Sequence, residues 1–223
     1  DVTPWRPDGV LTPCVYGVAH TSFVTAGLAT VRLHFTDPAD AGTFSVNEDV
    51  KSLTGPSGSP ITISGYSWVD ALTLELSILT GEFGEYVLRV GPHIATDLAE
   101  SLDGDRDGVP GEESEDVSEL RFTITPPTIV DSEVSYQTTA DGVAIEFDRA
   151  MRGTSFSVAG DVLAFTGPNG PVTVESFEWT AMNRLLLRAD LSAAGAYELT
   201  LGPDVVDPGG NALDLDGDLI PGE

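Results

Sequence analysis

Two acidic, glycine-containing loops of similar sequence recur in this chain. The first covers residues 103–112 (DGDRDGVPGE) and the second covers residues 214–223 (DLDGDLIPGE). Both place an aspartate at every second position with glycine nearby, so a short segment can curl until several oxygen atoms converge on one cation. Their separation predicts two homologous domains of about 100 residues each.

The segments that precede the loops repeat in the same order. Val31–Phe35 matches Val143–Phe147, and residues 53–58 (LTGPSG) match residues 165–170 (FTGPNG). The spacing between equivalent residues is constant over this part and shortens by one residue later, which a single deletion in a turn explains. A register this regular indicates two copies of one domain.

Alternating apolar residues and closely spaced turns predict an all-β fold of the sandwich type. Val31, Leu33 and Phe35 fall on one face of a strand within residues 29–35. A second apolar face is formed by Leu72, Leu74, Leu76 and Ile78. Two further short strands are predicted at Thr43–Val46 and Asp49–Leu53.

The boundary between the copies is placed near residue 126. A predicted strand, Leu120–Thr125, is followed by Pro126 and Pro127, and a diproline forms a stiff linker. Domain 1 is therefore expected over residues 1–125 and domain 2 over residues 126–223. No counterpart of Leu120–Thr125 follows the second loop, so domain 2 either lacks its last strand or pairs without it, as a piece of a tandem array would.

The repeated motifs resemble bacterial Ig-like repeats of large surface and secreted proteins of planctomycete-like bacteria. The resemblance covers nearly the whole chain. It is carried by FSV at residues 44–46, YVLRVGP at residues 86–92, the loop at residues 103–112 and DVVDPGGNALD at residues 204–214. It implies two tandem Ig-like β-sandwich domains, an extracellular or cell-surface location and a spacer or adhesive role, and it implies no enzyme activity.

Calcium is the cation that these loops predict. Calcium accepts six to eight oxygen ligands in flexible geometry, whereas magnesium requires a strict octahedron, and zinc is disfavoured because the loops contain no Cys or His. The candidate ligands of the first site are Asp103, Asp105, Asp107 and Glu112, with Asp97 or Asp116 as additions. Those of the second site are Asp214, Asp216, Asp218 and Glu223, with Asp207 in reserve. The competing interpretation is two solvated acidic turns without an ion.

The two loops differ at the residue after the third aspartate. Gly108 stands there in the first loop and Leu219 in the second. Glycine eases the tight turn that such a loop needs. We therefore expect the second site to be weaker or differently shaped.

Charge and composition exclude several classes of function. The chain carries 36 Asp and Glu against 10 Lys and Arg, a formal net charge of −26, which repels the phosphates of nucleic acids and anionic lipids. No stretch approaches the ~20 apolar residues of a membrane-spanning helix. The single cysteine, Cys14, cannot form an intramolecular disulfide. His20, His34 and His93 stand in unlike contexts and indicate no catalytic centre.

These observations predict a non-catalytic, calcium-stabilised module whose partners are the neighbouring domains of a larger extracellular protein. Calcium would order the acidic loops and stiffen the junction between the domains. The alternative is a calcium-dependent carbohydrate- or protein-binding module, which could serve as an accessory to a secreted enzyme. Trp68 and Trp179 could stack on sugar rings, but their equivalent places inside predicted strands favour a role in the core.

Overall fold

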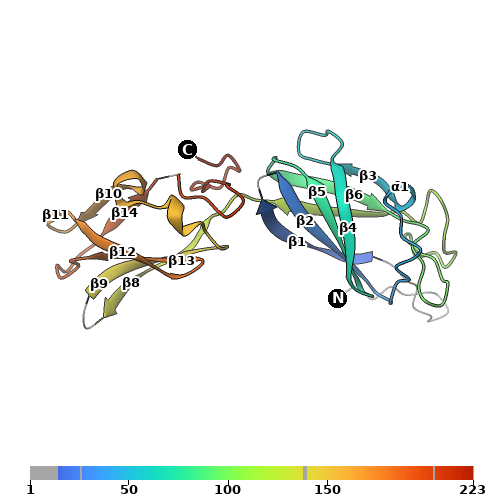
Figure 1. Ribbon diagram of the computed structural model, residues 1–223, viewed down its shortest axis with the longest axis horizontal. Coiled ribbons are helices and arrows are strands. Elements are labelled where there is room, and N and C mark those ends of the chain that lie inside the picture. Colours follow the sequence, from blue (N-terminus) through green and yellow to red (C-terminus); the bar gives the residue numbers. More distant parts are fainter. Residues whose placement is uncertain (1–14, 26, 138–139, 203, 223) are drawn as a thin grey trace. The chain divides into compact units, whose positions relative to one another are not determined.

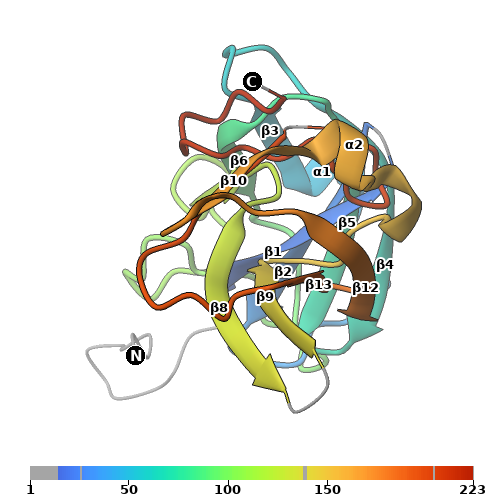
Figure 2. The ribbon, with the colours of Figure 1, turned by 90° about the vertical axis from the view of Figure 1, so that its left-hand side faces the viewer.

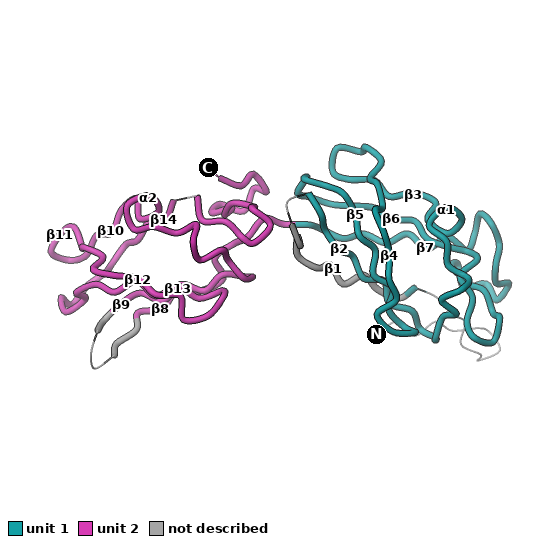
Figure 3. Tube along the Cα trace, in the orientation of Figure 1, with its two compact units in different colours: residues 1–124 teal, residues 125–223 magenta. Residues whose placement is uncertain are grey.

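The computed structural model describes residues 15–222 except 26, 138–139 and 203, and it describes no side chains for residues 16–25 and 135–141. The described chain is all-β apart from two four-residue helices and one 3-10 turn. It divides into two compact units, residues 1–124 (unit 1) and residues 125–223 (unit 2), shown in Figure 3.

Unit 1 consists of two antiparallel sheets (Figure 1). The first has the order β1-β2-β5-β4, with β1 at Val15–Thr25, β2 at Leu28–Phe35, β5 at Thr73–Leu79 and β4 at Thr62–Asp70. The second has the order β3-β6-β7, with β3 at Val50–Thr54, β6 at Gly84–Val90 and β7 at Ser118–Ile124. Side chains from both sheets meet in one apolar core, as expected for a sandwich.

Unit 2 also consists of two antiparallel sheets, and its larger sheet repeats the strand order of the larger sheet of unit 1. Its larger sheet has the order β12-β13-β9-β8, with β12 at Val174–Ala181, β13 at Arg184–Ala189, β9 at Ala140–Phe147 and β8 at Ile129–Gln137. Its smaller sheet has the order β11-β10-β14, with β11 at Gly170–Pro171, β10 at Val162–Gly167 and β14 at Glu198–Leu201. In Figure 2, which turns unit 2 toward the viewer, β8 and β9 are yellow and β10 is orange.

The alternating residues of the central strands form the cores as predicted. Val31, Leu33 and Phe35 on β2 are buried, and so are their counterparts on β9. Leu74, Leu76 and Ile78 on β5 are also buried, but the prediction was wrong for Leu72. Leu72 lies in the turn before β5 and is 41% exposed, because Asp70 Oδ1 accepts the Leu72 N–H (2.8 Å) and closes that turn.

The predicted strand at Thr43–Val46 is replaced by a turn that leads into the helix α1 (Val46–Asp49). The buried Asp49 side chain causes this, because its Oδ2 accepts the Ser45 N–H at 2.7 Å. Unit 2 has the same device. The 3-10 turn η1 (Gly153–Ser155) precedes α2 (Val158–Asp161), and Asp161 Oδ2 accepts the Ser157 N–H at 2.7 Å. A local side-chain hydrogen bond has overridden strand propensity.

Candidate metal centre

The first acidic loop connects β6 to β7 in unit 1 and is anchored by a buried leucine. Leu102, 2% exposed, donates its N–H to the carbonyl oxygen of Ile94 (3.1 Å) and accepts the N–H of Gly111 (2.9 Å). Its side chain belongs to the core of unit 1. The loop is therefore closed at its base by backbone hydrogen bonds, and its aspartates follow directly after a fixed point.

Asp103 is the most constrained carboxylate of this loop. Its side chain is fully buried, and its Oδ2 accepts the Gly108 N–H at 3.1 Å. Its Oδ1 is also buried and has no hydrogen-bond partner among the described residues. A buried carboxylate oxygen without a protein partner is costly, and an ordered water or a bound cation can supply the missing contact.

Asp116, which the sequence indicated only as an addition, follows the loop in the chain and is fully buried. Its Oδ1 accepts the Gly104 N–H (2.7 Å) and its Oδ2 accepts the Glu112 N–H (2.6 Å). A Cβ at position 104 would lie 2.6 Å from the Asp116 carbonyl carbon, so glycine is required there. One carboxylate oxygen each from Asp103, Asp105 and Asp116 lies within 4.8 Å of the others.

Two other predicted ligands of the first loop lie outside this group of three. Asp107 is exposed, and its Oδ1 accepts the Val109 N–H at 2.8 Å. Glu112 is half-buried, and its Oε2 is buried with no partner in the described chain. Desolvation, followed by the charges of neighbouring carboxylates, raises the pKa of Glu112. The loop is thus a concentrated negative field that a cation would relieve.

Asp97 is exposed and takes no part in the cluster. Its described contact is a long backbone hydrogen bond, from its N–H to the Pro38 carbonyl oxygen at 3.4 Å. The structure therefore brings together Asp103 and Asp105 of the predicted set and adds Asp116. The sequence signal for Asp116 was its place in a turn next to the loop.

The second loop brings together Asp214, Asp216 and Asp218, again with carboxylate oxygens within 4.8 Å of one another. Asp214 is buried, but both of its oxygens have partners, the N–H groups of Gly217 (2.7 Å) and Leu219 (2.9 Å). The Asp214 N–H donates to the Pro127 carbonyl oxygen (3.0 Å). Glu223 lies outside the described residues.

The two loops share two left-handed backbone positions, but glycine occupies a different one of the two in each loop. Arg106 (φ 66°) and Gly108 (φ 93°) in the first loop correspond to Gly217 (φ 81°) and Leu219 (φ 74°) in the second. All four positions are left-handed, a region that costs a side chain about 1 kcal/mol. At these two positions, each loop therefore has one glycine and one strained residue. The sequence comparison of Gly108 with Leu219 found the glycine lost from the second loop but not the glycine gained at position 217.

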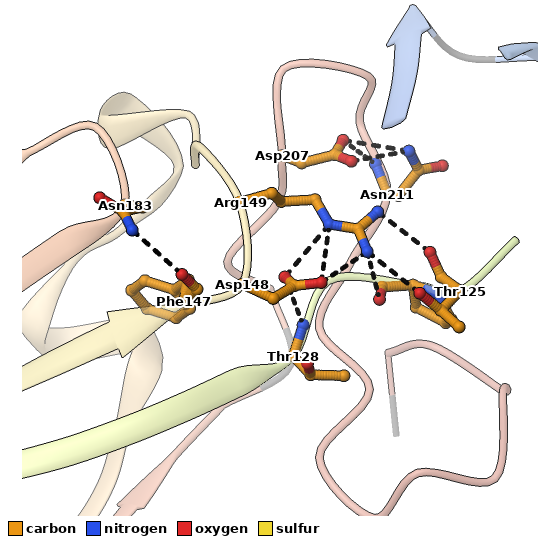
Figure 4. A network of polar contacts seen from close by, with 9 residues as sticks. Thr125, Thr128, Phe147, Asp148, Arg149, Asn183, Asp207 and Asn211 are labelled. Carbon is orange, nitrogen blue, oxygen red and sulfur yellow. Dashed lines mark hydrogen bonds and ion pairs between the residues drawn. The ribbon is translucent and has the colours of Figure 1, made fainter. Parts of the chain in front are cut away.

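Asp207, the reserve ligand of the second site, has a different role. It is buried, and its carboxylate accepts the Asn211 backbone N–H (3.0 Å) and two hydrogen bonds from the Asn211 side-chain amide (3.1 and 2.9 Å), as Figure 4 shows. Thr96 occupies the equivalent place in unit 1, where its Oγ1 accepts the Glu100 N–H at 3.2 Å. Both side chains close a turn rather than join an acidic cluster.

Arg149 organises the start of unit 2 and was not identified from the sequence. Its guanidinium donates to the carbonyl oxygens of Thr125 (3.0 Å) and Pro126 (3.1 Å) and to the Asp148 carboxylate (Figure 4). Asp148 also accepts the Thr128 N–H at 3.1 Å. These hydrogen bonds fix residues 125–128 to the body of unit 2. The same segment includes Pro127, whose carbonyl oxygen accepts the Asp214 N–H of the second loop.

The two repeated tryptophans belong to the cores, as their equivalent positions predicted. Trp68 packs against Phe35 with ring centroids 5.5 Å apart, and Trp179 packs against Phe147 at 5.7 Å. Both are partly buried against their core clusters. The third tryptophan of the sequence, Trp5, lies outside the described residues.

The described chain is thus an all-β protein with two acidic clusters that could hold a metal ion. No protein-family model matches it. No curated protein matches it either. Among the described residues, no helix is both long and apolar enough to cross a membrane.

Solved structures that are similar to this chain include parts of a bacterial S-layer protein. The N-terminal part of SbsC is 14% identical, with a TM-score of 0.38, and the alignment covers 92% of this chain and 44% of that one. For SbsC domains 1–6 the values are 14%, 0.39, 94% and 26%. For SGBP-B from a complex xyloglucan utilization locus in Bacteroides uniformis they are 15%, 0.28, 94% and 48%. This chain therefore spans less than half the length of each.

Proposed function

We propose that this chain is a non-catalytic, calcium-stabilised pair of Ig-like repeats that serves as a spacer or adhesive segment of a larger extracellular bacterial protein. The two units are the two repeats, with the boundary at the Pro126–Pro127 linker. The observation that carries the calcium claim is the buried, unpartnered Oδ1 of Asp103, on a residue that offers one carboxylate oxygen within 4.8 Å of those of Asp105 and Asp116.

The donor set explains why calcium is the proposed ion. Asp103, Asp105 and Asp116 offer carboxylate oxygens, which hard divalent cations prefer. Two of these residues are fully buried in positions set by backbone N–H donors, so part of the site is formed before the ion arrives. Waters and loop carbonyl groups would complete the six to eight ligands that calcium accepts.

The size of the expected effect fits a stabilising rather than a signalling role. Extracellular modules bind calcium with Kd of about 10⁻⁴ to 10⁻³ M, so 1 mM calcium would stabilise each site by roughly 0.4 to 1.4 kcal/mol. Calcium is scarce in the cytosol, and this range of affinity suits an extracellular location. In a tandem array the contributions add from repeat to repeat.

A lectin-like role finds less support in the geometry. It requires an exposed aromatic platform near a cation, whereas Trp68 and Trp179 pack against phenylalanines of the cores. The spacer proposal requires only the acidic loops and the β-sandwich fold. Binding to a glycan array that depends on calcium would overturn the spacer proposal in favour of the lectin-like one.

Thermal unfolding of the whole chain tests the proposal. The midpoint should rise in 1 mM calcium relative to excess EDTA, and 1 mM magnesium should give a smaller rise. Asp103→Asn should abolish the part of the rise that belongs to unit 1. Asp97→Asn is the matched control, because it removes an equal charge from the same unit outside the cluster. Equal midpoints in calcium and in EDTA would refute the proposal.

A further inference from the structure

The smaller sheets of the two units differ at the edge that β7 forms in unit 1. In unit 1, β7 pairs with β6 along its whole length, from Gly84 opposite Ile124 to Val90 opposite Ser118. The counterpart of β6 in unit 2 is β14, which pairs with β10 on one side and is the outermost strand of its sheet among the described residues. The edge that β7 covers in unit 1 is therefore uncovered in unit 2.

A groove of about 410 Å³ lies along this edge within unit 2. One wall is β14 and the residue before it, and the opposite wall is β8, the counterpart of β1. In unit 1, β7 packs against β1 as well as pairing with β6, so the groove occupies the place that β7 fills. Its apolar lining includes Ile129, Val134, Tyr197, Leu199, Leu201 and Leu215.

Tyr197 marks the place in unit 2 of an aromatic contact that unit 1 makes between β6 and β7. It is the counterpart of Tyr86, whose ring stacks on Phe122 of β7 with centroids 5.3 Å apart and an interplanar angle of 11°. The two tyrosines are held alike, since the Tyr86 hydroxyl donates to the Glu82 carbonyl oxygen (2.6 Å) and the Tyr197 hydroxyl to that of Ala193 (2.8 Å). Tyr86 is fully buried, whereas Tyr197 is half-buried and lines the groove.

The neighbouring leucines show the same difference. Leu88 on β6 is paired with Leu120 of β7 and is 1% exposed, whereas its counterpart Leu199 on β14 is only half-buried. The register of β6 and β7, transferred to β14, sets a residue like Leu120 opposite Leu199 and one like Phe122 opposite Tyr197. A residue like Arg121 would stand opposite Glu198, a favourable cross-strand pair of opposite charges.

We propose that this groove binds an extended strand that follows the second acidic loop in the parent polypeptide. The strand would add to β14 antiparallel, as β7 adds to β6, with an aromatic residue stacked on Tyr197 and alternate apolar residues in the groove. This inference rests on the proposed function in one respect, that the chain is a segment of a larger protein.

The test uses the whole chain and a fluorescently labelled peptide with the sequence of residues 118–125 (SELRFTIT), titrated in 1 mM calcium and again in EDTA. We expect saturable binding with one peptide per chain. The same peptide with aspartate in place of its phenylalanine should not bind. Leu199→Glu should weaken binding about tenfold or more, because it places a charge in the apolar groove. Leu163→Glu is the control variant, since Leu163 is 62% exposed on β10 outside the groove.

A strand that is covalently linked to the chain avoids the weak binding expected of a separate peptide. A copy of residues 113–125 is attached after Glu223, so that the spacing from loop to strand equals that of unit 1. Backbone N–H groups of β14 should then gain protection from hydrogen exchange, and the aspartate version should not protect them. Absence of protection in both versions would overturn the inference, as would a dimer of the unextended chain that pairs β14 with β14. Calcium binding is measured on the same samples, so a failure of the calcium proposal is seen separately.

Discussion

The carboxylates of Asp103 and Asp116 converge across the first acidic loop, and both side chains are fully buried. Asp116 receives two backbone N–H groups, whereas Asp103 receives one and keeps a buried oxygen without a partner among the described residues. The proposed calcium ion would supply the partner that Asp103 Oδ1 lacks. An acidic turn in solvent would expose its carboxylates to water instead of burying them against one another.

Calcium binding should depend on pH because of Glu112. Burial and neighbouring carboxylates raise the pKa of Glu112, so the loop loses this negative charge, and part of its attraction for the ion, from a higher pH than it would with an ordinary glutamate. The apparent affinity, measured by calorimetric titration, should fall as the pH is lowered from 7 toward about 4.5. Glu112→Gln should flatten that part of the decline, and an identical decline in the variant would contradict this role for Glu112.

The left-handed position at Gly108 should not tolerate a side chain. Gly108→Leu copies the residue of the second loop and would leave two strained residues in one turn, Arg106 and the introduced leucine. We expect the free energy of unfolding to fall by about 1 kcal/mol in urea titrations. Gly65→Ala is the control, since Gly65 lies on β4 without a left-handed backbone and has no atom within 4 Å of an added Cβ. Equal losses in both variants would show that the backbone at Gly108 is not special.

The contribution of Asp49 to the free energy of unfolding should decrease as the pH rises. Burial raises its folded-state pKa above the ordinary value of 3.8. The folded state therefore binds the proton more tightly, and the contribution of Asp49 to stability declines as pH rises from about 4 through the folded-state pKa. The stability of the wild type minus that of Asp49→Asn should decrease over this range.

Asp190 provides a control of opposite sign. Hydrogen bonds from Ser192 lower the pKa of Asp190, so its contribution to stability is present above the ordinary pKa and is lost as pH falls. The same comparison made with Asp190→Asn should slope the other way. Parallel slopes for the two variants in urea unfolding from pH 3 to pH 7 would refute the assignment of Asp49.

Arg149 should contribute most of the polar stabilisation at the start of unit 2. Arg149→Ala leaves the carbonyl oxygens of Thr125 and Pro126 without this donor, and we expect a loss of about 1–3 kcal/mol in the free energy of unfolding. Arg152→Ala is the matched control, because the Arg152 guanidinium makes one exposed hydrogen bond, to the Pro208 carbonyl oxygen. A smaller loss for Arg149→Ala than for Arg152→Ala would contradict this interpretation.

The sandwich could be predicted from sequence because burial alternates along each central strand. Val31, Leu33 and Phe35 recur in register with Val143, Ile145 and Phe147, and all six are buried. The turn at Ser45 could not be predicted, since it depends on one aspartate reaching back to a backbone N–H four residues earlier. Such a contact leaves no periodic signal.

The acidic site was only partly predictable for a related reason. The spacing within the loop indicated Asp103 and Asp105, but the third member, Asp116, stands beyond the loop and is brought back by its hydrogen bonds to Gly104 and Glu112. The exchange of glycine between Gly108 and Gly217 also required the backbone angles. Local spacing predicts which residues are available, and the path of the chain decides which of them meet.

Diffraction from crystals grown in millimolar calcium tests the central claim most directly. Anomalous difference density at long wavelength should show one ion about 2.3–2.6 Å from Asp103 Oδ1, with oxygens of Asp105 and Asp116 in its coordination sphere. Crystals of Asp103→Asn should lack that peak. Wild-type crystals with only water between these carboxylates, at a calcium concentration well above 1 mM, would contradict the account.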